Sequence, residues 1–267
     1  MPERASIVSL ASDLRLLGVA PGDAVMVHAS LRAIGPVERG AAGVVEALDR
    51  AVGPDGTALM VLGARDDWDW VNARPESERA SLLAGSPPFD PLSTPAQPDV
   101  GVLAEAFRRT PGTRVSDHPE GRFAARGLLD RHFLLDVPWD DYYGPGSPLE
   151  RLVDARGKVL RLGADPNTVT LIHYAEYLAD VPNKRRVRRH RLVATPRGPA
   201  LRVVECLDDN NGIVDYPGGD YFADILQEYL EQDRARRGVV GRAASELLDA
   251  RDLTRFATRW MTERFGG

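Results

Sequence analysis

Two short, uninterrupted runs of apolar residues, separated by one helix-length segment, constrain the fold of this chain most. Ala24-Val-Met-Val-His28 and residues 57–62 have strand length and little polar alternation, which is typical of strands buried in a parallel sheet. Residues 41–51 between them have helical spacing and are followed by a Gly-Pro-Asp-Gly turn. This strand–helix–strand order predicts an α/β fold with a mostly parallel sheet.

The same periodicities predict the remaining elements. We expect helices over 6–17, 101–109, 149–154, 222–236 and 253–265, a strand over 158–163, and a turn and helix within 124–132. A small β-hairpin is expected over 192–207, with Pro196-Arg-Gly198 at its turn. The chain length of 267 residues is compatible with one domain over 1–267.

A long proline-rich segment over 63–98 interrupts this regular order. It contains six prolines and begins with the acidic aromatic cluster Asp66-Asp-Trp-Asp-Trp70. Ordered loops of this length are usually functional, because an idle connection is shorter. We therefore expect this segment to line a substrate site.

Bulk composition excludes several classes of protein. Hydrophobic residues make up 43% of the chain, but no apolar run approaches the ~20 residues that a membrane span needs. The single cysteine, Cys206, excludes an internal disulfide and a cysteine-based zinc site, and the N-terminus lacks a secretory pattern, so a reducing cytoplasm is expected. The formal charge of -5 argues against nucleic acid as a partner.

Acidic residues gather at three places, which begin at Asp66, Asp140 and Asp208. A cleft lined with one sign of charge concentrates ligands of the opposite sign. A polycationic small molecule is therefore a sensible substrate class. Polar surface loops are the alternative interpretation of each cluster.

The segment 168–176 carries the strongest chemical signal. His173 and Glu176 are three residues apart on an expected helix, so they share one face and the carboxylate can orient the imidazole. No nucleophile lies nearby in the sequence, which suits an enzyme whose nucleophile arrives with the substrate, such as an amine. A surface pair or a capping contact is the alternative.

Other polar motifs are less specific. The segment 27–35 follows the first strand and is a reasonable place for phosphate or pyrophosphate, although an ordinary turn with a helix cap fits as well. His118 is expected to be fixed in a turn and His28 to be a satisfied core histidine. The cationic run 184–191 is interpreted as a solvated loop or strand edge. No dense ligand motif predicts a metal site.

An ordered set of blocks spanning nearly the whole chain resembles the aminoglycoside 3-N-acetyltransferases, and most of all their gentamicin-modifying branch. The blocks lie at 22–36, Pro88-Phe-Asp-Pro91, His118-Pro119 with Phe123-Ala-Ala-Arg-Gly127, Gly144-Pro-Gly-Ser-Pro148, 157–163, Val169-Thr-Leu-Ile-His-Tyr-Ala-Glu176, Pro182-Asn-Lys-Arg-Arg186, 211–214 and 238–241.

This resemblance implies a three-layer α/β/α fold unlike the GNAT acetyltransferases. It implies acetyl-CoA as cosubstrate and transfer to the 3-amino group of a 2-deoxystreptamine aminoglycoside, and hence antibiotic resistance. Apart from the resemblance, we expect no metal and a monomer or homodimer. By position, His173 is the general base, Glu176 its orienting partner and Thr170 a hydroxyl for the oxyanion. Residues implied to bind the two substrates are Ser30, Leu31 and Arg32 for coenzyme A, and Asp66, Phe89, Asp90 and Asp209 for the aminoglycoside.

Two departures from the family pattern concern the acceptor site. The family's Ser-Trp-x-Asp block is replaced by residues 63–70 with a displaced tryptophan, and Arg122 stands where the family has serine. An acyltransferase of the same fold that acts on a different amine therefore remains an alternative. A non-catalytic binder of cationic antibiotics is a second alternative, but it leaves the His173–Glu176 pair unexplained.

Overall fold

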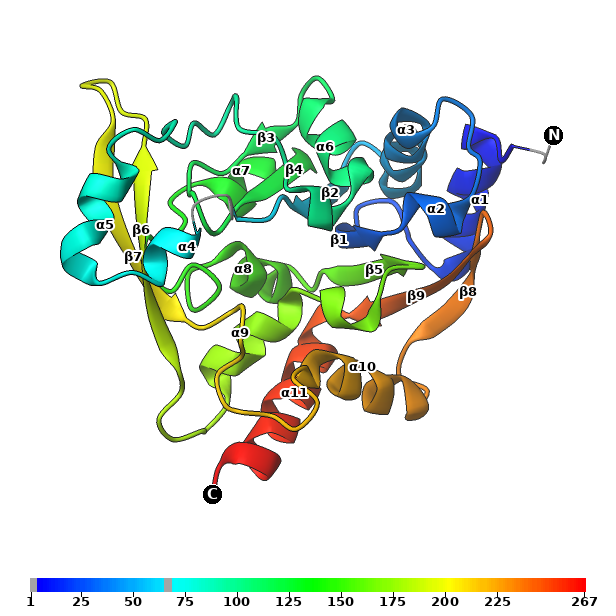
Figure 1. Cartoon of the computed structure of the whole chain (residues 1–267). Helices are drawn as coiled ribbons and strands as arrows, with labels where there is room; N and C mark the ends of the chain where they lie inside the picture. Colours follow the sequence, from blue (N-terminus) through cyan, green and yellow to red (C-terminus); the bar gives the residue numbers. More distant parts are fainter. Residues whose placement is uncertain (1–3, 65–68) are drawn as a thin grey trace.

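The computed structural model describes residues 4–64 and 69–267. These residues form a seven-stranded sheet in the order β3-β4-β2-β1-β5-β9-β8 and a separate two-stranded sheet (Figure 1). The strands of the large sheet are β1 Ala24–Ala29, β2 Thr57–Val61, β3 Arg114–Val115, β4 Phe123–Gly127, β5 Lys158–Leu162, β8 Arg236–Val240 and β9 Ala243–Asp249.

The direction of the strands confirms the predicted α/β sheet. β1 pairs in parallel with both β2 and β5. β4 runs antiparallel to β2 and β3, and β9 runs antiparallel to β5 and β8. Within the described part of the chain, β1, β2, β3, β5 and β8 of this sheet therefore share one direction, and β4 and β9 oppose it.

Helices cover both faces of the sheet and make three layers. Strand side chains alternate between the faces, so that Met26 packs in one core while Val25 and Val27 pack in the other. The core around Val25 lies under α1 Ile7–Leu17, α3 Ala41–Val52 and α6 Val102–Arg109. The core around Met26 lies under α7 Asp130–Leu134, α8 Pro148–Asp154, α9 Leu171–Leu178, α10 Tyr221–Glu231 and α11 Ala250–Phe265.

The small hairpin stands apart from the sheet, beside the long loop (Figure 1). Its strands, β6 Arg186–Val193 and β7 Ala200–Leu207, pair over eight residues each. The long loop contains two short helices, α4 Asp69–Asn72 and α5 Glu76–Leu83. Phe89 connects the two parts, because its N–H donates to Leu192 O at 2.7 Å and its carbonyl accepts from Ala194 N at 2.8 Å.

Three predicted segments were wrong in extent or type. Residues 123–127 form strand β4, and the helix begins only at Asp130. The helix expected to reach Arg236 ends at Glu231, because Asp233 adopts a left-handed conformation and Arg236 starts β8 against β9. The hairpin begins at Arg186, six residues earlier than expected, since its first strand is rich in arginine and lacks the apolar signal of a strand.

The carboxyl ends of β1 and β5 meet at one edge of the sheet. Ser30, directly after β1, donates its N–H to Leu162 O at 3.0 Å. After β5, the 3-10 turn η2 Pro166–Thr168 leads into α9. The chain after β1, which forms the short helix α2 Leu31–Ile34, thus lies beside the start of α9. Among the described residues, no helix is long and apolar enough to cross a lipid bilayer.

Candidate active site

Helix α9 carries the predicted pair in hydrogen-bonded contact. His173 Nδ1 lies 2.7 Å from Glu176 Oε2. Glu176 is buried, with 1% of its side chain exposed, whereas His173 retains 16%. Because a carboxylate accepts the hydrogen bond, the proton resides on Nδ1, which leaves Nε2 of the neutral ring as a proton acceptor.

Further side chains hold this pair in place. Tyr221, at the start of α10, donates its hydroxyl to Glu176 Oε1 and accepts the N–H of Ile213 at 3.0 Å. The imidazole of His173 stacks on Tyr143 with ring centroids 5.0 Å apart and an interplanar angle of 9°. Both carboxylate oxygens of Glu176 are therefore engaged, and the imidazole cannot tilt freely.

The pKa of His173 is raised above its ordinary value of 6.5. Burial lowers it by disfavouring the charged ring, but the charge and hydrogen bond of Glu176, together with the charge of Asp209, outweigh burial. The pair therefore favours an imidazolium once a proton has been taken up. This is the property required of a general base.

A cleft of about 610 Å³ runs from the end of β1 to His173. The structure brings together here the three residues predicted to bind coenzyme A and two of the three predicted catalytic residues. The lining includes Ser30, Leu31, Arg32, Thr170 and His173. Ser30 Oγ accepts the N–H of Ala33 at 3.3 Å and so begins α2. Thr170 occupies the position before α9, and its hydroxyl lies 3.4 Å from Thr168 O.

A second cavity of about 240 Å³ is also lined by His173. Its lining includes His173, Glu176, Asp209 and Asp220. Asp209 is the predicted acceptor residue that the structure brings to the dyad. Tyr142 donates its hydroxyl to Asp209 Oδ2 at 2.5 Å, and the burial of Tyr142 raises the pKa of its hydroxyl.

The other predicted acceptor residues lie elsewhere or outside the described residues. Asp66 belongs to the latter group. Phe89 is buried, with the guanidinium of Arg122 5.3 Å from its ring centroid. Asp90 accepts the N–H groups of Leu92 and Ser93 and closes a turn. Among the described residues that line the two cavities at His173, neither Phe89 nor Asp90 appears.

Arg122, the predicted departure from the family pattern, is a buried support for the long loop. Its guanidinium donates to Gly63 O and Pro95 O at 3.1 and 3.0 Å and to Thr94 O at 2.9 Å. These carbonyls belong to both ends of the 63–98 segment. Arg122 therefore ties the two ends of the loop together, and the His173–Glu176 contact is formed in its presence.

Of the predictions for His118 and His28, the first is confirmed and the second is wrong. His118 is fixed in its turn as predicted, since Nδ1 accepts from Gly121 N at 2.7 Å and Nε2 contacts Trp139 O at 2.8 Å. His28 is buried, but its Nε2 has no hydrogen-bond partner among the described residues, so the prediction of a satisfied histidine was wrong. Burial and the nearby Arg161 lower the pKa of His28 to about 4.

Sequence reasoning missed Tyr143, Tyr221 and Phe222. Phe222 contacts the His173 ring with centroids 4.6 Å apart. These aromatic residues are 30 to 50 positions from His173 in the chain, and each lies in an ordinary turn or helix pattern. No local motif identifies them, because Tyr221 and Phe222 reach the pair only through the packing of α10 against η2, and Tyr143 comes from the loop before α8.

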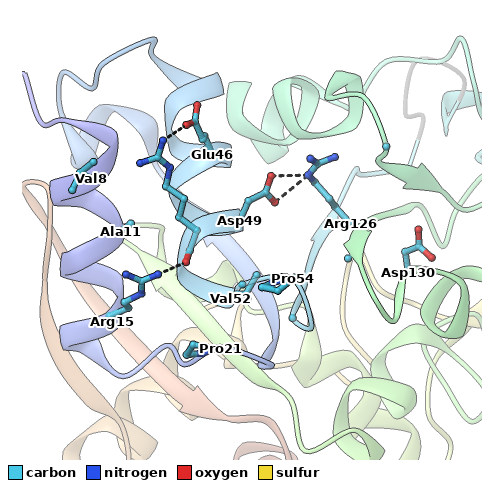
Figure 2. Close-up of a pocket in the computed structure, with 15 residues that line it drawn as sticks. Val8, Ala11, Arg15, Pro21, Glu46, Asp49, Val52, Pro54, Arg126 and Asp130 are labelled. Carbon is cyan, nitrogen blue, oxygen red and sulfur yellow. Dashed lines mark hydrogen bonds and ion pairs between the residues drawn. The ribbon is translucent and has the colours of Figure 1, made fainter.

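A larger cavity of about 920 Å³ lies at the opposite end of the sheet, between α1 and α3 (Figure 2). Four of the charged side chains that line it form two ion pairs with one another. Arg126 contacts both carboxylate oxygens of Asp49 at 2.8 and 3.0 Å, and Arg50 binds Glu46 at 2.6 Å. Size alone therefore does not mark the site.

Comparison with known proteins gives a consistent result. Residues 26–262 match the model of the family described as aminoglycoside 3-N-acetyltransferase. An aminoglycoside N(3)-acetyltransferase III of Serratia marcescens is 40% identical over 98% of this chain and 98% of its own length.

Solved structures agree with the sequence matches. AAC-IIIb in a binary complex with CoASH is 42% identical, with a TM-score of 0.93 over 99% of this chain and 98% of its own. AAC-VIa bound to sisomicin is 35% identical, with a TM-score of 0.92 over 99% of this chain and 100% of its own. This chain therefore belongs to the aminoglycoside 3-N-acetyltransferase family and is an acyltransferase.

Proposed function

We propose that the enzyme transfers the acetyl group of acetyl-CoA to the 3-amino group of 2-deoxystreptamine aminoglycosides, with His173 as general base. The observation that carries the proposal is the His173–Glu176 contact of 2.7 Å at the junction of two cavities. One cavity suits an elongated donor, and the other is lined by carboxylates that suit a cationic acceptor. Relatives in complex with CoASH and with sisomicin support this division.

The donor is proposed to occupy the cleft along Ser30, Leu31 and Arg32, with its thioester at the start of α9. The nitrogen of the acceptor amine attacks the carbonyl carbon while His173 Nε2 removes its proton, directly or through one water. Collapse of the tetrahedral intermediate breaks the C–S bond and releases the coenzyme A thiolate, which takes up a proton. Glu176 stabilises the imidazolium in the meantime, and no acyl-enzyme forms.

The oxyanion needs hydrogen-bond donors on the donor side of His173. The Thr170 hydroxyl, which lines the cleft, is the candidate, because the N–H groups of Ile172 and His173 already donate to Val169 O and Thr170 O. Removing one such donor typically costs ~3 kcal/mol in the barrier. Thr170 is therefore proposed as a contributor to the rate rather than to binding.

The acceptor is proposed to bind against Asp209, whose carboxylate lines the smaller cavity with His173. Asp66, Phe89 and Asp90 stay predictions for this role. Since Phe89 and Asp90 stabilise the loop itself, their contribution would be to its shape rather than to direct contact.

The buried Arg122 favours one second candidate, an acyltransferase that accepts a different amine. Its three carbonyl contacts give the 63–98 loop an interior that a serine could not supply. A loop with a different interior can present a different wall to the acceptor. This alternative retains the donor, the dyad and the chemistry.

Release of coenzyme A thiol separates these candidates. Acetyl-CoA is offered with gentamicin, sisomicin, tobramycin, kanamycin or apramycin as acceptor, and the product is located by NMR. Turnover with acetylation at N3 is the expected result. Tight acetyl-CoA binding with no thiol release from any of the five would reject the aminoglycoside assignment in favour of another amine.

A further inference from the structure

The cationic run 184–191 is not the solvated segment that its composition predicts. Along β6, Arg188 is exposed, with 51% of its side chain accessible, and it pairs with Glu76 at 3.0 Å. Arg189 and Arg191, by contrast, have only 7% and 5% of their side chains exposed. The strand therefore directs part of this positive charge into the protein, behind the acceptor cavity.

Arg189 is the centre of a buried cluster of carboxylates. Its Nη2 lies 2.6 Å from Asp209 Oδ1 and 3.9 Å from Asp208 Oδ1. Its Nη1 lies 3.8 Å from Glu120 Oε2 and donates to the Tyr142 hydroxyl at 3.0 Å. One guanidinium thus lies within 4 Å of three carboxylates.

Asp209 links this cluster to the acceptor cavity. Its side chain is 14% exposed and lines the cavity that also contains His173 and Glu176. One of its oxygens faces Arg189 and the other accepts the Tyr142 hydroxyl at 2.5 Å. Arg189 itself lines the adjoining cavity of about 440 Å³.

Carboxylates outnumber guanidinium groups among the described side chains of the cluster. The carboxylates are Glu120, Asp208 and Asp209, and the guanidinium groups are those of Arg189 and Arg191, which pairs with Glu120. Of these carboxylates, Asp209 lines the acceptor cavity, where it would face an ammonium group of a bound acceptor.

We propose that Arg189 is a positioning residue of the acceptor site, which holds Asp209 at the cavity wall and compensates the carboxylates buried behind it. The inference rests on the proposed function, because it assigns Asp209 to a cationic acceptor. Without the guanidinium, three close carboxylates in a buried site repel one another. Asp209 then loses its position at the cavity wall.

The test compares three variants. Arg189→Met removes the charge at similar length, Arg189→Lys keeps the charge but not the forked geometry, and Arg188→Met removes the exposed neighbour as a matched control. KM for sisomicin, KM for acetyl-CoA and kcat are measured for each, and isothermal titration gives the sisomicin Kd independently of turnover.

We expect Arg189→Met to raise KM and Kd for sisomicin at least about tenfold, as for a broken buried charge pair. KM for acetyl-CoA should stay within about twofold, because the donor cleft is built from other elements. Arg189→Lys should recover part of the loss, and Arg188→Met should behave as wild type.

An unchanged sisomicin KM in folded Arg189→Met, or an equal rise in both KM values, would overturn the inference and leave the proposed function standing. If Arg189→Met does not fold, Arg189→Lys and Tyr142→Phe decide. Both should raise the sisomicin KM selectively, and wild-type values in both would refute the role. If the wild-type enzyme neither binds nor acetylates any aminoglycoside, the proposed function is wrong and this assignment falls with it.

Discussion

The two ends of the central sheet each carry a cavity, and they differ in what their polar groups do. At the start of β2, the larger cavity is lined by ion pairs between partly exposed side chains, such as Arg126 with Asp49. At the end of β1, the cleft leads to His173 and a carboxylate with 1% exposure. The smaller site thus contains a buried carboxylate, whereas the described residues that line the larger cavity include no charged side chain buried to this extent.

This difference shows why volume is a poor guide to function. Breaking an ion pair between exposed groups costs little free energy, since water replaces each partner. Burying a carboxylate costs free energy unless its oxygens accept hydrogen bonds. Glu176 meets this condition, because His173 and Tyr221 each contact one of its oxygens. The buried Glu176 and the raised pKa of its partner His173 are the reasons to propose this end of the sheet as the site of the chemistry.

The largest effect is expected for His173→Ala, which removes the proposed general base. We expect kcat to fall by ~100-fold or more, because a positioned general base contributes at least that much. Binding of coenzyme A should be nearly unchanged in isothermal titration, since the donor cleft keeps its other walls. A variant that retains more than about a tenth of the wild-type rate would remove His173 from the role of base.

The pH dependence of kcat provides a second test of His173 as the general base. The pKa of His173 is raised, because Glu176 and Asp209 outweigh burial, so the fraction of free base declines as the pH falls through a value above 6.5. On the acid side kcat should drop about tenfold per pH unit. A kcat that stays flat down to pH 5.5 at saturating substrate would contradict this assignment.

The raised pKa of His173 also makes the stability of the folded enzyme depend on pH. The folded enzyme favours the imidazolium, so the stabilising contribution of His173 is fully present below 6.5, its ordinary value. It is lost as the pH rises through the raised folded pKa. The difference in melting temperature between wild type and His173→Ala should therefore be larger at pH 6 than at pH 9.

Regular elements were predictable because each carries its own period. The runs 24–28 and 57–62 became β1 and β2, and the i, i+3 spacing of His173 and Glu176 gave a real hydrogen bond. Both signals are local, since they depend only on neighbouring residues along one strand or helix. The residues predicted for coenzyme A directly follow β1, and the structure accordingly brings them together in one cleft.

The acceptor side was less predictable, because it depends on contacts between distant residues. Arg189 lies 20 residues before Asp209 and 69 after Glu120, and nothing in an arginine-rich strand shows that it will be buried. The same arginines concealed the start of β6. Tyr221 reaches Glu176 across 45 residues, and only the packing of α10 brings them together.

A smaller effect is expected for Tyr221, which contacts Glu176 of the His173–Glu176 pair. Tyr221→Phe removes the hydroxyl that Glu176 Oε1 accepts, while His173 keeps its own contact. A hydrogen bond to a charged group is worth ~1.5–3 kcal/mol, so kcat should fall about tenfold or somewhat more. Tyr216→Phe is the matched control, since Tyr216 donates to the exposed Asp224 at 2.6 Å. Equal losses in both variants would mean that α10 acts only as a packing element.

The smallest effect is expected at the far end of the sheet, where Asp49→Asn tests the other half of the comparison. Asp49 and Arg126 are 33% and 27% exposed, so solvent screens their pair and its loss should lower the free energy of unfolding by only ~0.2–1 kcal/mol. kcat and both KM values should remain within about twofold, because the dyad lies at the opposite strand ends. Steady-state kinetics and urea unfolding of the same preparation measure both quantities. A fall in kcat without a loss of stability would show that this larger cavity communicates with the active site.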